Sequence, residues 1–435
     1  MNIIPKIGFC VIYHPFEDNA ENAQKISENS VKLLKTIKDI ELVVADKLVK
    51  DVNSAILAGN QFKEANVDLI CIKLATWSSN DYILDIISLY EVPFIFWSYP
   101  HMHAGSMCGG LQFNMVFKEL HKECIFVYGD DDQALEKIRN YAICVCLKNN
   151  MKTLRFLKIG NRTQGMAEVI YDEFSVKEVF GPRVISIGFD QFKEDVDNIA
   201  DKDASDLWID LKKKVGKISV EEFNGINAIK NYLALKKIIE AEQISGVTVE
   251  CYPNFMGEHC LAFSLLANEG IPGACEGDIN SLILMYILMK LSESPVHNID
   301  PLYLYEDENS IIGSHCGSGS FELAEDHQEI ELTNVRLANK GLCVLFPSKP
   351  GKITMANLVG RKGTYRMGSI EGNAIHAEMV FPGNPIKVKL PITIKRFLEV
   401  IENSGMGHHW IITYGNHLKS LECLASLLKV NLIKF

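Results

Sequence analysis

The stretch VDLICIKLATWSSNDYILDIISLYEVPFIFWSYPHMH, Val67–His103, decides the fold of the N-terminal part of the chain. It holds two short apolar runs, Val67–Leu74 and Val92–Trp97, whose β-branched and aromatic residues are typical of buried strands. Two more strands and one helix are expected nearby, at Lys6–Ile12, Ile125–Tyr128 and Asn19–Ile37. Strands that alternate with helices indicate a parallel sheet with helices on both faces, because parallel strands need long crossover connections.

The same alternation resumes further along the chain. Four more strands and one long helix are expected at Leu154–Ile159, Arg183–Ile187, Gly246–Glu250, Ile271–Ala274 and Gly225–Ala241. We therefore expect a second parallel sheet. Ligands usually bind beyond the carboxyl ends of such strands, so the loops that follow them are the first places to look for a site.

The last third of the chain has a different pattern. From Ser310 to Val388 there are short alternating runs and many glycines, which indicate antiparallel strands. The expected strands are Val335–Leu337, Leu342–Phe346, Lys352–Asn357, Thr364–Ser369 and Ala374–Phe381. A helix, a strand, a second helix and a final strand follow, the first three at Ile394–Glu402, Trp410–Tyr414 and Leu418–Leu428.

These patterns predict an α/β protein with three domains. Two tandem, doubly wound parallel-sheet domains are expected at residues 1–152 and 153–295, the second carrying the first metal carboxylate. A β-rich domain, antiparallel or barrel-like, is expected at residues 296–435 and would carry the remaining ligands. A chain of 435 residues is too long for one ordinary domain.

Composition excludes several classes of function. The formal net charge of −11 argues against nucleic acid as a partner, because phosphate binding needs a basic face. The longest apolar run, Leu282–Met289, is far shorter than the roughly 20 residues that a membrane span needs, and the start of the chain does not read as a signal peptide. The 12 cysteines are scattered and form no CxxC pair, which fits a reducing cytoplasm.

The residues richest in chemistry begin at GACEGDINSLILMYILMKL, Gly273–Leu291. Glu276 follows a short apolar strand, and Asp278 stands where the N-cap of an almost wholly apolar helix belongs. Such a helix is deeply buried, so a carboxylate at its start is costly unless it is paired or binds a cation. Asp278 also has the plain interpretation of a helix cap, and Glu276 that of an ordinary loop carboxylate.

Three further groups have the residue types that complete a metal site. Asp300 precedes Pro301, His315 lies in a glycine-flanked segment, and His408 and His409 follow Gly407. Two carboxylates with one or two imidazoles suit a divalent cation such as Mn²⁺, and the lack of cysteine argues against structural zinc. Spacing alone does not separate these roles from structural ones.

This set of residues resembles the L-fucose isomerases. In that family a glutamate opens a helix, a later aspartate completes a carboxylate pair on manganese, and a histidine in a late Gly-x-His loop is the third ligand. Glu276, Asp300 and His409 match this order, and GMGHHWIITYGNHLKSLECLASLL at 405–428 resembles the closing strand–helix unit. L-arabinose isomerases have a similar histidine pair and one more metal histidine, for which His315 is the candidate.

The N-terminal part shares the resemblance. The segment ANVDLICIKLATWSSNDYILD at 65–85 resembles the strand and loop that carry a tryptophan to the sugar pocket of a neighbouring subunit, and Trp77 matches that tryptophan. The loop after the first strand lacks the arginine that fucose isomerases use for substrate, and the chain is shorter than theirs. These differences indicate a divergent, compact relative that acts on another sugar.

The resemblance implies a metal-dependent aldose–ketose isomerase that works through an ene-diol. Glu276 and Asp300 would hold the metal and also move the proton, and His409 would complete the coordination. The sugar contacts would come from Trp77, His315 and His408. A cytoplasmic homo-oligomer, hexamer or trimer, with sites near subunit boundaries is also implied.

Two other classes of function remain open at this stage. The first is a catalytically silent sugar-binding or regulatory protein on the same scaffold, because a fold does not fix a function. The second is a metal-dependent hydrolase that uses the His101-x-His103 pair after a predicted strand.

Overall fold

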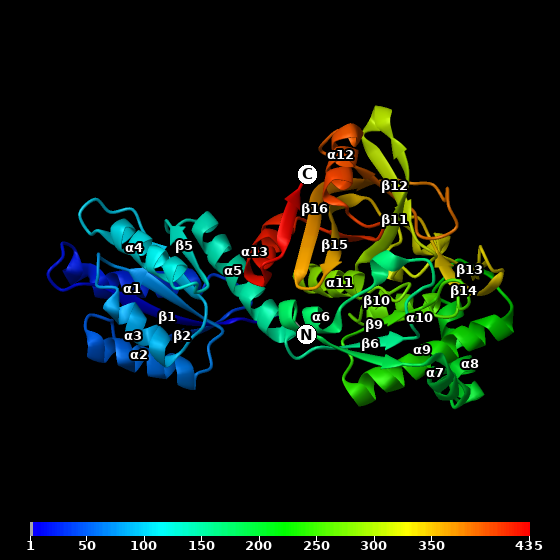
Figure 1. Cartoon of the computed structure of the whole chain (residues 1–435), viewed down its shortest axis with the longest axis horizontal. Helices are drawn as coiled ribbons and strands as arrows, with labels where there is room; N and C mark the ends of the chain where they lie inside the picture. The colour runs from blue at the N-terminus through cyan, green and yellow to red at the C-terminus, as the bar shows by residue number, and fades with distance from the viewer. Residues whose placement is uncertain (1–2) are drawn as a thin grey trace. The chain divides into compact units, whose positions relative to one another are not determined.

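The computed structural model describes residues 3–435, which form two compact units that divide between Asn149 and Asn150. The first unit, blue to cyan in Figure 1, contains a five-stranded sheet with the order β2-β1-β3-β4-β5. All its pairings are parallel, as the alternation of strands and helices predicts. The strands are β1 (Lys6–Ile12), β2 (Glu41–Val44), β3 (Leu69–Leu74), β4 (Phe94–Ser98) and β5 (Cys124–Tyr128).

Helices connect these strands in sequence. They are α1 (Ala23–Leu34), α2 (Val52–Glu64), α3 (Asp81–Leu89) and α4 (Ser106–Glu119), with α5 (Asp132–Met151) after the last strand. Strands β3 and β4 are buried along their whole length, which explains why they read as continuous apolar runs. Lys73 is the one charged residue in these two apolar strands. It is 1% exposed and pairs with Asp130, and its Nζ lies 3.7 Å from the centre of the Trp97 ring.

The second unit begins with a four-stranded parallel sheet with the order β10-β9-β6-β7. Its strands are β6 (Arg155–Ile159), β7 (Arg183–Ile187), β9 (Gly246–Val249) and β10 (Gly273–Ala274). Its helices are α6 (Glu173–Val179), α7 (Phe189–Asp197), α8 (Asp201–Lys212), α9 (Glu222–Glu242), α10 (Cys260–Asn268) and α11 (Ile279–Ser292).

A seven-stranded sheet forms most of the rest, with the order β15-β18-β11-β12-β17-β16-β19. Because β15 also pairs with β16, six of these strands close into a barrel, and β19 is added outside it, parallel to β16. The strands are β11 (His297–Tyr305), β12 (Ser310–Ser314), β15 (Gly351–Arg361), β16 (Thr364–Ile375), β17 (Ile386–Lys389), β18 (Trp410–Tyr414) and β19 (Asn431–Lys434). The prediction of an antiparallel, barrel-like C-terminal part is confirmed.

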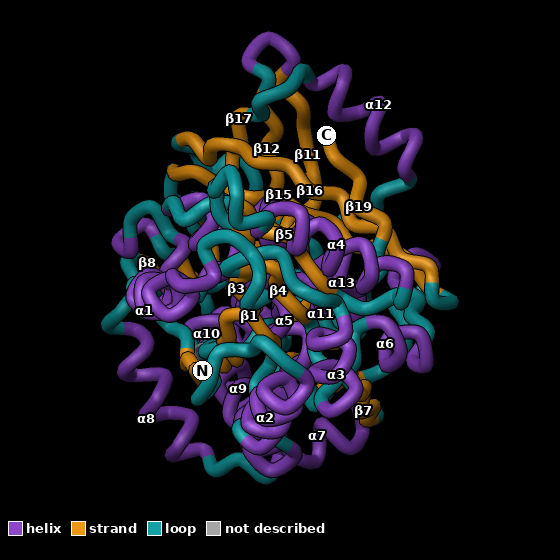
Figure 2. Tube along the Cα trace, turned by 90° about the vertical axis from the view of Figure 1, so that its left-hand side faces the viewer, coloured by secondary structure: helices purple, strands orange, loops and turns teal. Residues whose placement is uncertain are grey.

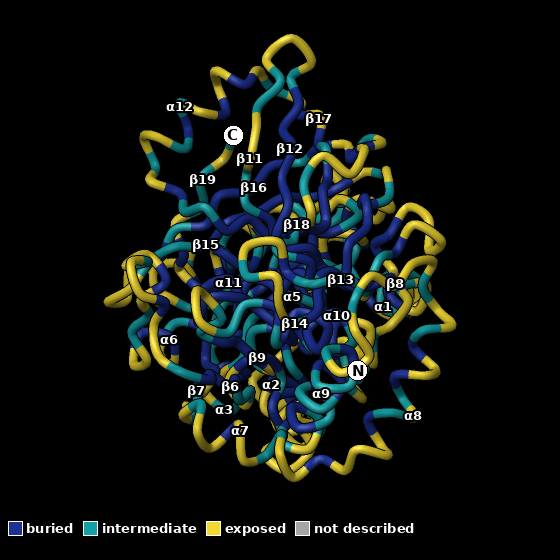
Figure 3. Tube along the Cα trace, turned by 90° about the vertical axis from the view of Figure 1, so that its right-hand side faces the viewer, coloured by how far each residue is buried: buried dark blue, intermediate teal, exposed yellow. Residues whose placement is uncertain are grey.

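Helix α11 joins the two sheets of this unit. It is buried from Ile279 to Met289, and it contacts β9 and β10 on one side and β15 and β18 on the other. Figure 3 shows α11, β12 and β18 in the dark blue of buried chain. Helix α12 (Ile394–Ser404) runs beside the barrel strands in Figure 2, and its Phe397 packs on the rings of Trp410 and Phe435. The remaining helix is α13 (Leu418–Leu428).

A small three-stranded sheet completes the second unit. In it β13 (Glu331–Val335) pairs with β14 (Lys340–Leu345) and, in parallel, with β8 (Lys217–Ser219). The predicted strand at Val335–Leu337 is wrong, because the chain turns between β13 and β14 at residues 336–339. The predicted strand at Ala374–Phe381 is also wrong beyond Ile375, where β16 ends.

The two predicted parallel-sheet regions are therefore present, and a barrel follows the second. The second compact unit contains both the second parallel sheet and the barrel, and the predicted division at residue 295 stays a prediction. No helix within residues 3–435 combines the length and the apolar character that crossing a membrane requires.

Candidate metal centre

The register of the barrel strands brings the candidate ligands together. Asp300 lies on β11, the strand between β12 and β18. On one side it pairs with Ser314, the residue before His315. On the other side its neighbour Ile299 pairs with Trp410, the residue after His409. The pairing therefore places the side chains of Asp300, His315 and His409 at one end of adjacent strands.

Glu276 reaches the same point from the parallel sheet. It follows β10 in a left-handed conformation with a φ of 64°, and Gly277 follows with a φ of 73°. Thr163 holds this turn by donating a hydrogen bond from its Oγ1 to the Glu276 carbonyl at 2.9 Å. A non-glycine residue in this region costs about 1–2 kcal/mol and is often found at functional sites. The turn ends β10 and starts α11.

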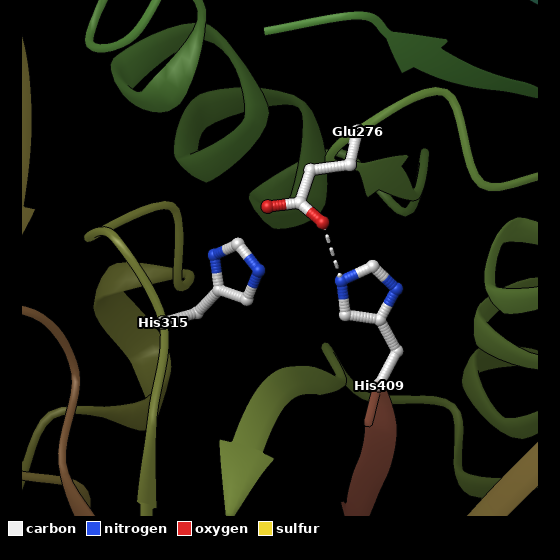
Figure 4. A group of neighbouring side chains, drawn as sticks. All are labelled: Glu276, His315 and His409. Carbon is white, nitrogen blue, oxygen red and sulfur yellow. Dashed lines mark ion pairs between the residues drawn. The ribbon is translucent and has the colours of Figure 1, made fainter. Parts of the chain in front are cut away.

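The distances within the cluster are short. His409 Nε2 lies 3.1 Å from Glu276 Oε2 and 3.9 Å from Asp300 Oδ1. Candidate ligand atoms of Glu276, His315 and His409 lie within 4.8 Å of one another, and the same holds for Asp300, His408 and His409. Figure 4 shows the side chains of Glu276, His315 and His409 turned toward one another.

Four atoms of this cluster are buried and have no well-directed hydrogen bond within residues 3–435, although Glu276 Oε2 and His409 Nε2 form an ion pair at 3.1 Å. They are Glu276 Oε2, Asp300 Oδ1, His315 Nε2 and His409 Nε2. Buried polar atoms are rarely left without a partner, because the desolvation they suffer is then uncompensated. Oxygen and imidazole nitrogen together suit a divalent cation. The residues present therefore fit a metal ion.

The remaining nitrogen of each histidine ring has a definite partner. His409 Nδ1 lies 2.8 Å from Asp278 Oδ2. Since a carboxylate accepts, Nδ1 keeps its proton, and once Nε2 loses its own proton the lone pair of Nε2 faces the cluster. At His315 the backbone N–H of Cys316 donates to Nδ1 at 2.9 Å. In a neutral ring Nε2 of His315 then carries the proton, so His315 is better suited to donate a hydrogen bond than to bind a metal.

Asp278 also caps α11, as its position in the sequence predicts. Its carboxylate accepts from the Ser281 backbone N–H at 3.0 Å and from the Ser281 hydroxyl. Its contact with His409 could not be found from the sequence, because the two residues are 131 positions apart. Asp278 thus fixes both the start of the helix and the orientation of an imidazole.

Electrostatics couple the carboxylates to His409. Burial lowers the pKa of His409, but the hydrogen bonds and charges of Asp278 and Glu276 outweigh it and raise that pKa to about 10. In return, His409 lowers the pKa of both carboxyls, although burial acts in the opposite direction. Burial also lowers the pKa of His315, but the charge of Asp300 outweighs it and raises that pKa to about 9, so both imidazoles carry a positive charge at neutral pH when no metal is bound.

His408 lies at the edge of the same cluster. Its Nε2 is 3.5 Å from Glu276 Oε2, and its Nδ1 contacts Glu168. Burial and the charge of His409 lower its pKa to about 4, so its ring is neutral. Glu168 lies in a short turn for which the sequence offers no signal.

Lys158 on β6 is a second residue that the sequence analysis missed. A Cβ built on Gly277 would lie 4.0 Å from its Nζ, so the ammonium group is close to the Glu276 turn. Lys158 is 7% exposed, lies over the ring of Tyr171 and makes no ion pair with a described residue. A lysine inside a buried parallel strand is rare. This unusual position is the feature of the sequence by which Lys158 could have been identified.

Two sets of residues that the sequence suggested for a functional site are not members of the cluster. Trp77 belongs to the first unit, where its indole donates to Gln112 Oε1 at 2.8 Å and its ring lies 5.8 Å from that of His14. All the clustered residues belong to the second unit. His101 and His103 are exposed, and neither is in the two candidate metal groups found among the described residues.

The chain is similar to known proteins over most of its length. A protein named sulfoquinovose isomerase from Priestia megaterium is 23% identical over 390 residues, which are 85% of this chain and 86% of that protein. Proteins of the same name from Clostridium sp. and Alkalicoccus urumqiensis are 23% and 21% identical, over 94% and 84% of this chain and 95% and 86% of their own lengths. No family model matches the chain.

One similar solved structure carries no argument about this chain. An ABC transporter solute-binding protein from Clostridium phytofermentas with bound L-rhamnose is 10% identical, covers 80% of this chain and has a TM-score of 0.18. That score is too low to support a likeness of fold. The four isomerase relatives therefore carry the assignment, and the prediction of an enzyme is confirmed in preference to a catalytically silent scaffold. The chain is a sugar isomerase, an intramolecular oxidoreductase that interconverts an aldose and a ketose.

Proposed function

We propose that this isomerase depends on a divalent metal held by Glu276, Asp300 and His409. The observation that carries the proposal is that His409 Nε2 lies 3.1 Å from Glu276 Oε2 and 3.9 Å from Asp300 Oδ1, in a buried cluster of possible metal ligands. Mn²⁺ is the metal that the resemblance to fucose isomerases implies, and the mixed oxygen and nitrogen donors suit it. When bound, the ion would polarise the sugar carbonyl and stabilise negative charge on its oxygen.

The side chains of this site supply the remaining steps. Aldose–ketose conversion moves a proton between C1 and C2 of the open-chain sugar and another between O1 and O2. Glu276 and Asp300 both have an oxygen free to accept a proton, so they are suited to act as the base and acid. Burial of Glu276 keeps bulk water from competing for the proton.

The two central histidines receive different roles. Asp278 holds His409 with its Nε2 lone pair toward the cluster, as a metal ligand requires. Cys316 holds His315 in the tautomer that donates from Nε2, which suits a hydroxyl oxygen of the sugar. Neutral His408 would make a further sugar contact.

The substrate we propose is a sugar that carries an anionic substituent, with sulfoquinovose as the first candidate. The relatives named sulfoquinovose isomerase support it, since that name denotes a sulfonated sugar. Lys158 supports it independently, because its ammonium group lies beside the Glu276 turn and makes no direct ion pair within residues 3–435, although the charges of Glu250 and Asp278 act on it. A positive charge in a buried site favours an anionic ligand.

Trp77 and the assembly extend the proposal beyond one chain. We propose a cytoplasmic homo-oligomer, a trimer or hexamer, in which Trp77 of one subunit contacts the sugar bound by another. The resemblance to fucose isomerases supports this arrangement. Trp77 is only partly buried in its own unit, so part of its ring remains available.

Metal content and turnover measured on one sample test the proposal. Wild type and Glu276→Gln would be stripped of metal, reloaded with Mn²⁺ and offered sulfoquinovose, L-fucose, L-arabinose and D-glucose. We expect about one metal per wild-type chain and isomerisation of the sulfonated sugar, with both lost in the variant. Turnover by metal-stripped wild type would refute the metal dependence, and turnover of neutral sugars alone would refute the substrate.

A further inference from the structure

A cavity of about 430 Å³ lies in the second unit. It is bounded by α7, α9, the segment from Phe255 to His259 and the end of the β13–β14 hairpin. None of its lining residues belongs to the candidate metal groups. Its volume is within the range of small-molecule pockets, about 300–1,000 Å³.

The deepest polar group of the cavity is His259. Its side chain is 2% exposed, and neither ring nitrogen makes a hydrogen bond within residues 3–435. Burial lowers its pKa to about 4, so the ring is neutral and offers one donor and one acceptor. A ligand that satisfies both nitrogens must itself be able to donate and accept, as a hydroxyl group does.

The walls of the cavity contain a flat apolar surface and a row of amide side chains. Phe189 and Phe255 stack with ring centres 3.6 Å apart, so the pair presents one outer aromatic surface rather than a slot. Asn224, Asn227 and Asn231 are spaced by three and four residues and therefore lie on one face of α9, which lines the cavity. Each amide can donate and accept.

The charges of the cavity lie at its rim and have both signs. Asp190, Lys193, Asp197 and Lys340 are exposed lining residues. The half-buried Glu258 lies 3.8 Å from Lys340, which offsets its charge. The interior therefore favours neither an anion nor a cation. An aromatic face with neutral donors and acceptors is the chemistry that fits the apolar face and the hydroxyls of a sugar ring.

We propose that this cavity is a second ligand site that binds a neutral polyhydroxylated ring, a sugar or a cyclitol. The C–H face of the ring would lie on the Phe189–Phe255 pair. Its hydroxyls would bond to His259 and to the amides of Asn227 and Asn231. The proposal does not depend on the metal or on the substrate of the catalytic centre.

Binding of closed-ring compounds separates this site from catalysis. Methyl α-D-glucopyranoside, methyl β-D-galactopyranoside and myo-inositol have no free carbonyl and cannot be isomerised. Their binding to the full-length protein would be measured by saturation-transfer NMR and calorimetry. The variants are His259→Phe, which fills the space with an apolar ring of similar shape, and Asn231→Leu. Circular dichroism would confirm that each variant is folded.

Two further variants are controls. Asn403 on α12 bonds to the carbonyl four residues before it at 2.8 Å, as Asn231 does at 2.9 Å, but it lies outside the cavity. Asn403→Leu therefore removes the same local bond without touching the site. Glu276→Gln disables the proposed metal site alone.

We expect at least one probe to bind wild type, Asn403→Leu and Glu276→Gln equally. His259→Phe and Asn231→Leu should weaken it about tenfold or more, because each leaves ligand hydroxyls without a partner. Absence of binding by all three probes would overturn the proposal. So would binding that is lost in Glu276→Gln and retained in His259→Phe, since the probes would then occupy the catalytic centre.

Discussion

His409 is held from both sides, and Asp278 is the less obvious of its two partners. Glu276 faces Nε2 and Asp278 faces Nδ1, so the ring cannot turn without losing a charged contact. An imidazole that is fixed in one tautomer needs no reorganisation before it binds a metal. At the scale of single residues, the affinity of the site is therefore expected to depend on Asp278 as well as on the ligands.

Asp278→Asn tests this dependence. The amide can still cap α11, but it no longer favours the tautomer with a free Nε2, so Mn²⁺ affinity should fall about 10- to 100-fold. Calorimetric titration of Mn²⁺ measures it. Asp51→Asn is the matched control, because Asp51 caps α2 through the same contacts with a serine, Ser54, and faces no imidazole. Equal metal affinity in wild type and Asp278→Asn would contradict the role of Asp278.

Metal binding should also depend on pH. The pKa of His409 in the metal-free protein is raised to about 10, so at pH 6–8 the ring is protonated and a metal must displace that proton. Affinity should rise with pH over this range, by about tenfold per unit for one proton released. Calorimetry in buffers of different ionisation enthalpy counts the proton. A flat affinity between pH 6 and pH 8 would mean that His409 is not a ligand.

Lys158 should govern the choice of substrate. In Lys158→Met the positive charge is lost, so KM for sulfoquinovose should rise about tenfold or more, while any slow turnover of a neutral sugar is unchanged. Lys290→Met is the control, because Lys290 also lies over a tyrosine ring, that of Tyr286, but is in the last turn of α11, at the opposite end of the helix from Asp278. An equal effect on charged and neutral sugars would show that Lys158 acts on stability alone.

At the scale of helices and strands, local pattern was sufficient for several elements that are short apolar or amphipathic runs. The strands Lys6–Ile12, Arg183–Ile187 and Trp410–Tyr414 have the predicted bounds, because apolar runs of that length have few other uses. The helix Leu418–Leu428 also has its predicted bounds. The strand predicted at Val335–Leu337 was misread, because Val335 ends β13 and the apolar Leu337 lies within the turn at 336–339.

The site could be predicted from the sequence only in part. Its residues were identified one by one from their types, but their assembly depends on the pairing of β11 with β12 and β18, which no local pattern specifies. The contacts of Asp278 and Glu168 with the histidines come from this tertiary pairing alone. The ligand roles of Glu276, Asp300 and His409 stay predictions until metal is measured.

The contact between α8 and α9 provides a test of packing. Gly225 lies against Trp208, and a Cβ at this position would approach the indole to 2.4 Å. Gly225→Ala should therefore cost about 1–3 kcal/mol of unfolding free energy, although alanine is the better helix former. Denaturant unfolding measures the change. Gly188→Ala, with nothing within 4 Å of the new Cβ, should have little effect. Stabilisation by Gly225→Ala would contradict the packing.

At the scale of the whole molecule, the proposed site uses residues from both units. This can be tested by mixing two variant chains in one assembly. Trp77 belongs to the first unit and every clustered residue to the second. If subunits share sites, co-expressed Trp77→Ala and Glu276→Gln chains should recover about a quarter of wild-type turnover, the chance that an intact Trp77 meets an intact Glu276. Mixed assemblies that stay inactive would place Trp77 at the site of its own chain.

The separation of 131 positions between Asp278 and His409 has a consequence for biosynthesis. A ribosome makes Glu276 and Asp278 long before it makes the imidazole that balances their charge. Until β18 is complete, the growing chain carries two carboxylates at the start of the buried helix α11 without the imidazole that contacts both of them. A nascent chain arrested before residue 409 should therefore fail to retain Mn²⁺, and loading of the metal belongs to the last stage of folding.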